Sequence, residues 1–491
     1  MYLCKRLKTG SLLVPLFLIN VIGSANATEP LTRAQKTSIE EVAQRSVLLE
    51  NVNSKIWELA EVGLNETQSA KILVEQLVKE GFSVKQDIAG MPTAFVASYG
   101  EGKPVIGILA EYDALPGMSQ ERSALKKPVK SGQPGHACGH SGLGTGSLGA
   151  VLAIKASMQK HHLKGTIRLY GTPAEETVIG KVYMLLAGEF KDLDVCLHWH
   201  PSTKTRALAG SSKALVSVKY TFKGTAAHAS GSPENGRSAL DAVELMNVGV
   251  NYMREHIKDD SRLHYVITDG GGAPNVVPAQ ASVWYYIRAD DHHDVEKLYS
   301  WVNDIAHGAA RMTRTKLTSK IDTDCHEVVP NIPLAQLLEA NLHAVGAPEF
   351  SDADRKFARG LQAPLIEQFN TEFPMAIEES IQPYQESMSE PTRGSTDVGD
   401  ISWYVPTGGL ATTCFASKSP GHSWQNVAAI GSSIGVKGII YAAKVLASTT
   451  IHLLENPDSV QNASEDWRLH MKNREYTTLI PEGQGAPKRI R

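Results

Sequence analysis

The chain has 491 residues, and its 49 lysines and arginines against 52 aspartates and glutamates leave a formal net charge of -3. That charge excludes a whole-protein field that attracts nucleic acid, and the length suits about two or three domains. Hydrophobic residues make up 42% and charged residues 21%, which excludes a disordered, collagenous or coiled-coil chain. Five cysteines are too few for a disulfide scaffold.

Residues 1–27 have the pattern of a secretory signal peptide. Lys5, Arg6 and Lys8 precede a short apolar run at 12–21, and small residues at 25–27 suit a cleavage site. An uncleaved anchor or a buried first helix is the alternative. No later segment has the ~18 uninterrupted apolar residues that a membrane span requires. We therefore expect export to a periplasm or to the outside, with no membrane partner.

Hydrophobic periodicity predicts two helices over 29–81, followed by strands that alternate with helices. The first helix carries Ile39, Val42, Val47 and Leu48, and the second runs over 68–81. The later predicted strands are 94–99, 105–110, 166–170, 194–199 and 410–416, and the later helices are 143–162 and 180–190. This alternation predicts an α/β fold with a mostly parallel sheet.

Residues 211–321 have a different texture and predict an inserted α+β unit. An edge-type strand at 215–222, a helix at 238–257, a strand at 281–288 and a helix at 294–312 fit a ferredoxin-like β-α-β-β-α-β order. The main domain then comprises 28–210 and 322–465. Within it, the polar segment 357–397 is expected to be a surface insertion. The tail, 466–491, is expected to be loosely held.

The strongest chemical signal is the turn from Gly135 to His140, which reads Gly-His-Ala-Cys-Gly-His. A thiolate at Cys138 and an imidazole at His140 can point at one metal ion, and the glycines allow the backbone to turn tightly around it. In an oxidising compartment, a free thiol persists most easily when a metal holds it as thiolate.

Other polar groups follow predicted strands, and the carboxyl ends of strands in an α/β sheet share one edge. These groups are Glu111 to Asp113, Glu175 with Glu176, His200, and His422. Together with Cys138 they suit a pair of divalent ions with an open position for water. Two adjacent glutamates are costly unless one binds metal and the other handles a proton. A solvated surface turn is the alternative for this pair.

The histidines differ in what their positions indicate. His198 and His200 face the same side of a strand, and His200, at the strand end, is the better placed ligand. His136 is expected to be a neighbour of the metal turn, and spacing alone makes His228 a surface histidine. The remaining histidines are expected to be solvated, among them His161, His162, His292 and His293.

The other cysteines are expected to be unremarkable. Cys196 and Cys414 lie in apolar runs and are expected to be small buried side chains. Cys325 lies in a polar stretch and is either free or paired.

Competing motifs fail on their context. The glycines from 144 to 149 match the dinucleotide pattern, but a histidine-rich turn precedes them where a hydrophobic strand is required. Close helix packing explains them better. The sequence has no Gly-x-Ser-x-Gly elbow and no Walker-type phosphate loop, so serine esterase and nucleotide hydrolase chemistry are poor candidates.

Several motifs together resemble the dinuclear metallopeptidases of the aminoacylase and glutamate carboxypeptidase type. Within that family the chain looks most like the amidohydrolase branch with a Cys-Gly-His turn, and especially its aminobenzoyl-glutamate hydrolase B subgroup. The resemblance covers about residues 35–450. Its motifs are Ala110 to Pro116, Gly135 to His140, Pro173 to Glu176, His200-Pro201, Gly224 to His228, Pro274 to Pro278, Gly394 to Asp400 and His422 to Gln425.

The resemblance implies roles for matching residues. Glu175 would be the general base, Asp113 would orient the site, and His228 would reach across a dimer to the oxyanion. Asn275 and Arg288 would help to bind the substrate carboxylate. The metal ligands would be Cys138, the bridge, with His140, Glu176, His200 and His422. The inserted unit would be a lid and dimerisation domain whose closure excludes water.

The leading hypothesis is hydrolysis of an amide that joins an acyl or aminobenzoyl group to an amino acid such as glutamate. Two zinc or manganese ions per subunit would support it. A dipeptidase or N-acyl-amino-acid deacylase of the same family and a binding module without catalysis are the alternatives. The expected partners are a small amide substrate and a second subunit, either identical or related.

Overall fold

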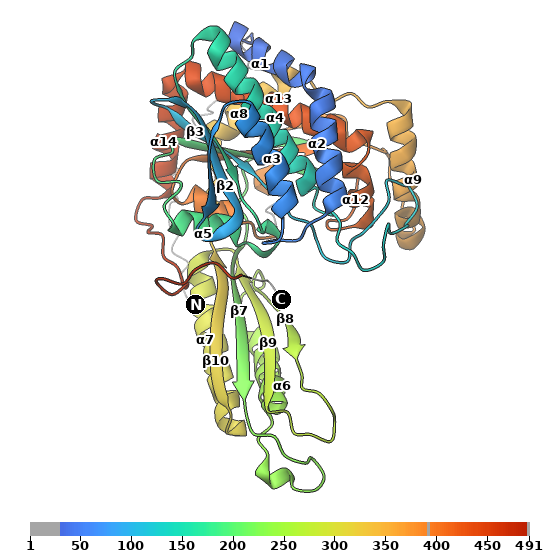
Figure 1. Ribbon diagram of the computed structural model, residues 1–491, viewed down its shortest axis with the longest axis vertical. Helices are drawn as coiled ribbons and strands as arrows, with labels where there is room; N and C mark the ends of the chain where they lie inside the picture. Colours follow the sequence, from blue (N-terminus) through green and yellow to red (C-terminus); the bar gives the residue numbers. More distant parts are fainter. Residues whose placement is uncertain (1–29, 390–392, 489–491) are drawn as a thin grey trace, which may run out of the picture.

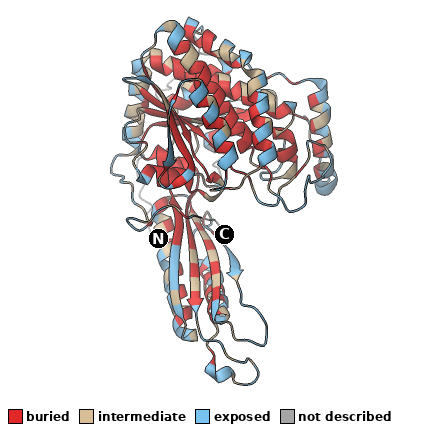
Figure 2. Cartoon of the chain, in the orientation of Figure 1, coloured by how far each residue is buried: buried red, intermediate tan, exposed pale blue. Residues whose placement is uncertain are grey.

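The computed structural model describes residues 30–389 and 393–488, so the predicted signal peptide at 1–27 lies outside the described residues. Figure 1 shows a large unit built on one sheet and an elongated small unit built on another. The predicted α/β fold class with an inserted α+β unit is confirmed. Buried residues fill the large unit on both sides of its sheet and line the helix-covered face of the small one (Figure 2).

The large unit contains an eight-stranded sheet whose centre is parallel. Its order is β1-β2-β4-β3-β5-β12-β6-β11, and the neighbours β4, β3, β5 and β12 run parallel. The strands are β1 Ser83–Ile88, β2 Met91–Glu101, β3 Val105–Ala110, β4 Gly165–Gly171, β5 Val195–Ser202, β6 Thr205–Leu208, β11 Ile381–Gln382 and β12 Thr407–Thr413. The carboxyl ends of the four central strands therefore meet at one edge.

Helices cover both faces of this sheet. The longest, α13, has the length and hydropathy of a membrane span, but it is mostly buried in the core beside α4. The helices of this unit are α1 Arg33–Gln44, α2 Ser46–Leu59, α3 Thr67–Lys79, α4 His140–His161, α5 Gly180–Leu186, α8 Ile332–Val345, α9 Asp352–Phe369, α10 Tyr384–Ser389, α11 Val398–Ser402, α12 Trp424–Ile430, α13 Ser433–Glu455 and α14 Pro457–His470.

The prediction of two helices over 29–81 is wrong, because three helices form there. Arg45 leaves the helical conformation with φ -92° and ψ 8°, which separates α1 from α2 and changes the helix phase. Val42 is fully buried, whereas Val47, expected on the same packed face, is 69% exposed. A regular 3.6-residue period cannot be carried across such a break.

The small unit has the predicted β-α-β-β-α-β order. Its sheet order is β10-β7-β9-β8, and α6 and α7 cover one face. The strand at 215–222 is not an edge strand, because β7 lies between β10 and β9. Its alternating pattern arises because helices cover only one face of the sheet. The elements are β7 Ala214–Lys223, α6 Ala239–Met253, β8 Arg262–Asp269, β9 Gln280–Ala289, α7 His292–Thr313 and β10 Lys316–Cys325.

The C-terminal tail crosses the junction between the two units (Figure 1), and the expectation that it is loosely held is wrong for residues 474–484. The Tyr476 hydroxyl donates to Asp400 at 2.9 Å, and the backbone N–H of Leu479 donates to Asp324 at 2.6 Å. Arg474 pairs with Glu327. The polar groups of the tail are hydrogen bonded across the junction, so a polar sequence is compatible with a firmly held segment.

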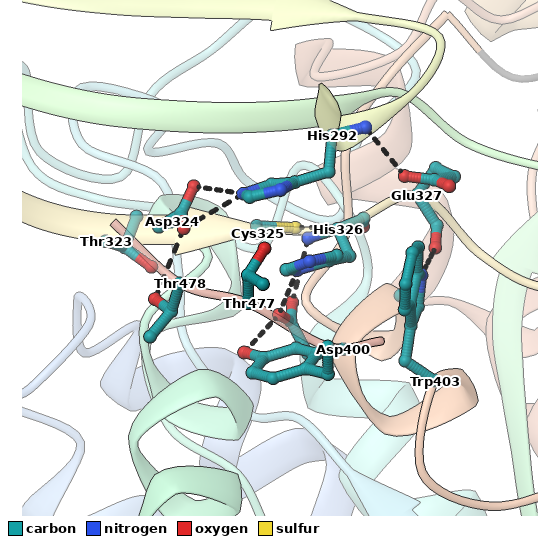
Figure 3. Close-up of polar contacts among 12 residues, drawn as sticks. His292, Thr323, Asp324, Cys325, His326, Glu327, Asp400, Trp403, Thr477 and Thr478 are labelled. Carbon is teal, nitrogen blue, oxygen red and sulfur yellow. Dashed lines mark hydrogen bonds and ion pairs between the residues drawn. The ribbon is translucent and has the colours of Figure 1, made fainter. Parts of the chain in front are cut away.

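A buried polar group, here named the junction cluster, lies under this tail (Figure 3). It comprises His292, Asp324, His326, Asp400 and Tyr476. His292 was expected to be solvated, but it is 3% exposed and its Nε2 lies 2.9 Å from Asp324. The His326 ring stacks between His292 and Tyr476, with centroid distances of 3.8 and 4.4 Å.

The expected surface insertion at 357–397 is also partly wrong. Leu361 and Gln362 on α9 are fully buried, as is Asp397. Gln362 Nε2 donates to the carbonyl oxygens of Met375 and Ser417, at 3.0 and 2.8 Å. The polar composition of segment 357–397 predicted an exposed position. Buried amides and carboxylates are nevertheless stable when they are hydrogen bonded.

Candidate metal centre

The carboxyl edge of the central strands gathers the polar side chains that the sequence marked. Glu111 and Asp113 follow β3, Glu175 and Glu176 follow β4 in a short 3-10 turn, and His200 lies on β5. Cys138 and His140 come from the turn that begins α4, and His422 precedes α12. We name Glu111, Cys138, His140, Glu175, Glu176, His200 and His422 the edge cluster.

Gly139 allows the turn that brings Cys138 and His140 to this edge. Its φ is +89°, in the left-handed region, and a Cβ there would lie 2.9 Å from the Pro201 side chain. Only glycine combines that conformation with such close packing. The turn therefore sets the thiol and the imidazole on the same side, facing β5.

Three pairs of ligand atoms in the edge cluster lie at similar short distances. Cys138 Sγ is 3.4 Å from His200 Nε2, and His422 Nε2 is 3.4 Å from Glu176 Oε2. His140 Nε2 is 3.3 Å from Glu111 Oε2. At zinc–ligand bond lengths of about 2.0–2.3 Å, two ligands of one tetrahedral ion lie about 3.3–3.6 Å apart.

Several buried atoms of this cluster have no hydrogen-bond partner among the residues that the structure describes. They are Glu111 Oε2, His140 Nε2 and Glu176 Oε1. A buried polar atom without a partner costs about 1–3 kcal/mol, so these three atoms require an explanation. Glu111 Oε2 and His140 Nε2 lie 3.3 Å apart, and Glu176 belongs to a separate group of possible ligand atoms with Cys138 and His422, so a pair of cations would give all three atoms partners.

The pKa values of Cys138 and Glu176 in the metal-free protein agree with a missing positive charge. At His140, burial disfavours the charged form, but the charges of Cys138 and Asp113 outweigh it and raise the pKa well above its ordinary value. Burial, followed by the charge of Glu176, raises the pKa of the Cys138 thiol to about 12. Burial also raises the pKa of Glu176 to about 8 and lowers that of His200 to about 4. Bound cations would favour the thiolate and the carboxylate and would leave the imidazole neutral, as ligation requires.

Glu175 lies in a strained turn. The residues on either side of the turn, Ala174 and Val178, have φ of 57° and 50°, which is uncommon for residues with a side chain. The Ala174 N–H donates to buried Glu66 at 2.8 Å, which holds the turn in place. Burial, and then the charge of Glu111, raises the pKa of Glu175 well above its ordinary value.

Asp113 contacts two members of the edge cluster. Its Oδ1 lies 2.8 Å from His140 Nδ1, and its Oδ2 accepts the backbone N–H of Glu176 at 3.0 Å. His140 therefore directs its other nitrogen, Nε2, into the cluster. A carboxylate behind a ligating imidazole is the usual arrangement at metal sites.

Sequence reasoning missed a buried lysine beside this site. Lys181 Nζ lies 2.7 Å from Glu111 Oε1 and 2.7 Å from Asp397 Oδ1, and all three side chains are at most 5% exposed. Burial disfavours the ionised form of Glu111, but the charge of Lys181 outweighs it and lowers the pKa of Glu111 to about 2. The available signal was a single cation in the apolar helix 180–186.

Not every predicted site residue joins the edge cluster. His228 is exposed in a loop after β7, where it pairs with Val276, and the N–H of Ala229 donates to the carbonyl of Asn275. His228 and Asn275 therefore lie on the small unit, in loops beyond its strands. Arg288, on the uncovered face of β9, donates to Ser395 Oγ at 3.1 Å, and its buried Nε has no partner within the described residues.

The histidines near the turn differ in their surroundings. Within the described residues, His200 belongs to a group of possible ligand atoms with Cys138 and His140, whereas His198 belongs to none. His136 Nε2 contacts the carbonyl of Ile56 at 3.0 Å, and its Nδ1 accepts the N–H of Ser141. Cys325 is buried as a free thiol, and free thiols also occur at Cys138, Cys196 and Cys414.

A cavity of about 660 Å³ opens between the edge cluster and the small unit. The large unit contributes Asp113, Leu115 and Glu176 to its wall, and the small unit contributes Trp284 and Tyr286 from β9. The two aromatic rings lie 5.4 Å apart and nearly perpendicular. The cavity is mostly apolar, with acidic groups at one end, which suits a small aromatic ligand.

The donor set fits a pair of divalent ions. Thiolate, imidazole and carboxylate are the ligands of zinc, and the groups Cys138/His140/His200 and Cys138/Glu176/His422 share the thiol. Ions held there would polarise a carbonyl group and lower the pKa of water, which is the chemistry of metal-assisted hydrolysis.

Comparison with known proteins agrees with this geometry. Residues 107–450 match the family model described as peptidase family M20/M25/M40. The chain is 37% identical over 454 residues to the B subunit of p-aminobenzoyl-glutamate hydrolase from Escherichia coli (strain K12), covering 88% of this chain and 94% of that protein. It is 27% identical to the Xaa-Arg dipeptidase of Mus musculus, covering 91% and 95%. A dinuclear metal-binding peptidase of the M20 family from Bacillus subtilis has the same fold, with a TM-score of 0.52 at 17% identity, covering 84% of this chain and 99% of that one.

Proposed function

The chain belongs to peptidase family M20/M25/M40 and is a metal-dependent amide hydrolase, and on that premise we propose its substrate, its catalytic residues and its assembly. The proposed substrate is an aminobenzoyl or other aromatic acyl group joined by an amide bond to an amino acid such as glutamate. The relative from Escherichia coli is named for p-aminobenzoyl-glutamate, which supports this choice.

One observation carries the proposal: the ligand-atom pairs at 3.3–3.4 Å surround a space that Glu175 also borders. Glu175 Oε2 is 3.8 Å from His140 Nε2. The proposed ligands are Cys138, as the bridge, with His140, Glu176, His200 and His422, and the ions are zinc or manganese. Both metals accept imidazole and carboxylate ligands.

In this proposal, ions held by these ligands would supply Lewis acidity and would lower the pKa of water. Glu175 takes the proton from that water and returns it to the leaving amine nitrogen. Its raised pKa in the metal-free chain means that it becomes a base only when positive charge is nearby. Asp113 holds the tautomer of His140, and His228 from a second subunit stabilises the oxyanion.

The cavity supports an aromatic acyl group. Trp284 and Tyr286 occupy alternate positions of β9 on its uncovered face, followed at the next alternate position by Arg288. An aryl ring would stack on the two aromatic side chains, and a carboxylate would pair with Arg288. Asn275 would assist from the second subunit.

A second subunit is part of the proposal because His228 and Asn275 lie outside the edge cluster of their own chain. The small unit offers a surface for it: the edge strand β8 exposes Val266 and Ile267, and α6 exposes Val248 and Tyr252. Such an edge pairs readily with another strand. The partner is a second copy or a related subunit, and the relative from Escherichia coli is itself named as a subunit. We also propose export after removal of residues 1–27.

The test measures hydrolysis and metal content on the same purified protein. The panel contains p-aminobenzoyl-glutamate, other N-acyl amino acids and dipeptides, including Xaa-Arg. We expect the protein to cleave p-aminobenzoyl-glutamate. This activity should be lost after chelation and should return when Zn²⁺ or Mn²⁺ is added. Glu175→Gln should keep the ions and lose about 10²–10⁴-fold in kcat, the usual contribution of a general base.

Near-normal turnover by Glu175→Gln would refute the assigned base. A matched control is Glu327→Gln, which alters a buried glutamate at the junction and should leave kcat unchanged. Preferential cleavage of Xaa-Arg would favour the dipeptidase alternative, which the 27% identity to such an enzyme supports. Metal binding without hydrolysis of any panel member would favour a binding module.

A further inference from the structure

Lys181 is a fully buried cation placed between two buried carboxylates. It lies on α5, and its Nζ is 2.7 Å from both Glu111 Oε1 and Asp397 Oδ1. The backbone N–H of Lys181 also donates to Asp397 Oδ2 at 2.9 Å. One positive charge thus faces two negative charges, which leaves an excess negative charge in the protein interior.

The second oxygen of Glu111 points away from Lys181 and into the edge cluster. Glu111 Oε2 is buried, has no hydrogen-bond partner in the described part of the chain, and lies 3.3 Å from His140 Nε2. That nitrogen is likewise buried without a described partner, because Asp113 occupies the other side of the ring. The distance between these two atoms is the distance expected between two ligands of one tetrahedral ion, so both atoms could bind the same cation.

We propose that Glu111 is a further ligand of the ion bound by His140, and that Lys181 and Asp397 are positioning residues that fix its carboxylate. This inference rests on the proposed metal centre and adds a residue absent from the predicted ligand set. Lys181 neutralises one oxygen of Glu111 and leaves the other free to bind, the outer support that ligating carboxylates commonly have.

The added ligand makes the two metal positions unequal. Glu111 shares a group of possible ligand atoms with His140 and Glu175, and His140 also belongs to the group of Cys138 and His200. With Glu111 added, the ion at His140 would have four protein ligands, whereas the group of Cys138, Glu176 and His422 keeps three. Four protein ligands are typical of closed sites, and three of sites that keep a position for water. An ion at the four-ligand position would therefore be held more tightly than an ion at the three-ligand position.

The decisive variant is Glu111→Gln in the full-length protein, because the Lys181–Asp397 pair stays balanced and the fold should persist. Zn²⁺ per chain is measured by mass spectrometry after dialysis, and affinities by competition with a chromophoric chelator. The unaltered protein should bind two ions of unequal affinity. In the variant the tighter affinity should fall at least about 10–100-fold, the range known for weaker outer-shell changes.

Asp354→Asn is the matched control. Asp354 is a buried carboxylate of the same unit that pairs with Lys437 at 2.6 Å and takes no part in the edge cluster. It should lower the Tm of the chelated protein and leave both affinities unchanged. The double variant Lys181→Met with Asp397→Asn removes the residues that hold Glu111 but leaves Glu111 itself unchanged. It should lower the affinity for the more tightly bound ion less than Glu111→Gln does.

Two outcomes are distinguishable failures. If Glu111→Gln binds two ions with unaltered affinities, Glu111 is only a counter-ion of Lys181, and the inference is wrong while the proposed function stands. If the unaltered protein binds no Zn²⁺ or Mn²⁺ but folds normally, the proposed function fails as well. Thermal unfolding of the chelated variants separates a loss of metal affinity from a loss of fold.

Discussion

The protein contains two clusters of histidines and carboxylates with very different internal bonding, and most of their residues are buried or half-buried. In the junction cluster, Asp324 contacts His292 and Asp400 contacts His326 (Figure 3). Asp324 also accepts from the backbone N–H of Leu479, and Asp400 accepts from the hydroxyl of Tyr476. His326 Nε2 lacks a partner within the described residues, but its ring is stacked between two others. In the edge cluster, three buried ligand atoms lack hydrogen-bond partners within the described residues, and two of them, Glu111 Oε2 and His140 Nε2, lie 3.3 Å apart.

This difference shows that residue type alone does not identify a metal site. Both clusters offer imidazoles and carboxylates, but the carboxylates of the junction cluster are already bonded across the two units. The edge cluster holds ligand atoms at coordination distances, and three of its buried atoms have no hydrogen-bond partner among the described residues. We infer that the junction cluster holds the units together, whereas the edge cluster binds ions. Four predictions separate these roles.

The largest effect on stability is expected at the junction. Asp324→Ala removes a buried carboxylate bonded to His292, Thr478 and Leu479, so it should lower the free energy of unfolding by about 3–5 kcal/mol. Chemical denaturation measures this, and metal content should not change. Asp352→Ala, which alters a fully exposed aspartate that pairs with Arg355, is the control and should cost little. Equal losses in both variants would contradict the comparison.

The aspartate that supports the edge cluster, Asp113, should behave in the opposite way. Asp113→Asn weakens the bond to His140 Nδ1, so Zn²⁺ affinity should fall about 10–100-fold with a smaller effect on the chelated fold. Chelator competition measures the affinity. The matched control is Asp400→Asn, another buried aspartate beside a histidine Nδ1, at 3.1 Å from His326. Loss of metal affinity in Asp400→Asn, with none in Asp113→Asn, would reverse our assignment.

The third prediction concerns pH and the chelated protein. Burial raises the pKa of Glu66 and Glu176 to about 8, so above their ordinary value of 4.5 the folded chain binds more protons than the unfolded chain. Stability then falls as pH rises toward 8. Burial lowers the pKa of His136 and His200 to about 4, which opposes this trend only below 6.5. The Tm of the chelated protein should therefore fall between pH 6.5 and 8.

Differential scanning fluorimetry with and without Zn²⁺ checks this expectation. The metal-loaded protein should show a smaller fall, because a cation replaces the proton on Glu176. A Tm of the chelated protein that rises over this range, or an equal slope in both forms, would show that protons on the edge cluster do not substitute for metal.

The smallest effect is expected for a single hydrogen bond of the tail. Tyr476→Phe keeps the ring that stacks on His326 and removes the bond to Asp400, so the free energy of unfolding should fall by about 1–2 kcal/mol. Tyr404→Phe, at a neighbouring ring that is 41% exposed, should change it little. No change in Tyr476→Phe would mean that the tail contributes little to the junction.

Local sequence patterns were enough to predict the α/β fold class and the strands at 105–110 and 166–170. They also marked the candidates Cys138, His140, Glu175, Glu176, His200 and His422. A strand that ends in polar residues and a glycine-flanked Cys-x-His turn can each be recognised from a few consecutive residues. Local sequence rules were therefore sufficient to predict them. The ligand roles of these residues and the part of His228 remain predictions for the experiments above.

The pairing of the polar residues emerged only in the folded chain. His292 was expected in solvent, the 357–397 segment on the surface and the tail loose. His292 and Asp397 are instead buried and hydrogen bonded or ion paired, and the half-buried Tyr476 is hydrogen bonded to Asp400. Lys181 is joined to Glu111 and Asp397 across 70 and 216 positions of the chain. The free energy of a buried charge depends on neighbours brought close by folding, and no local pattern encodes them.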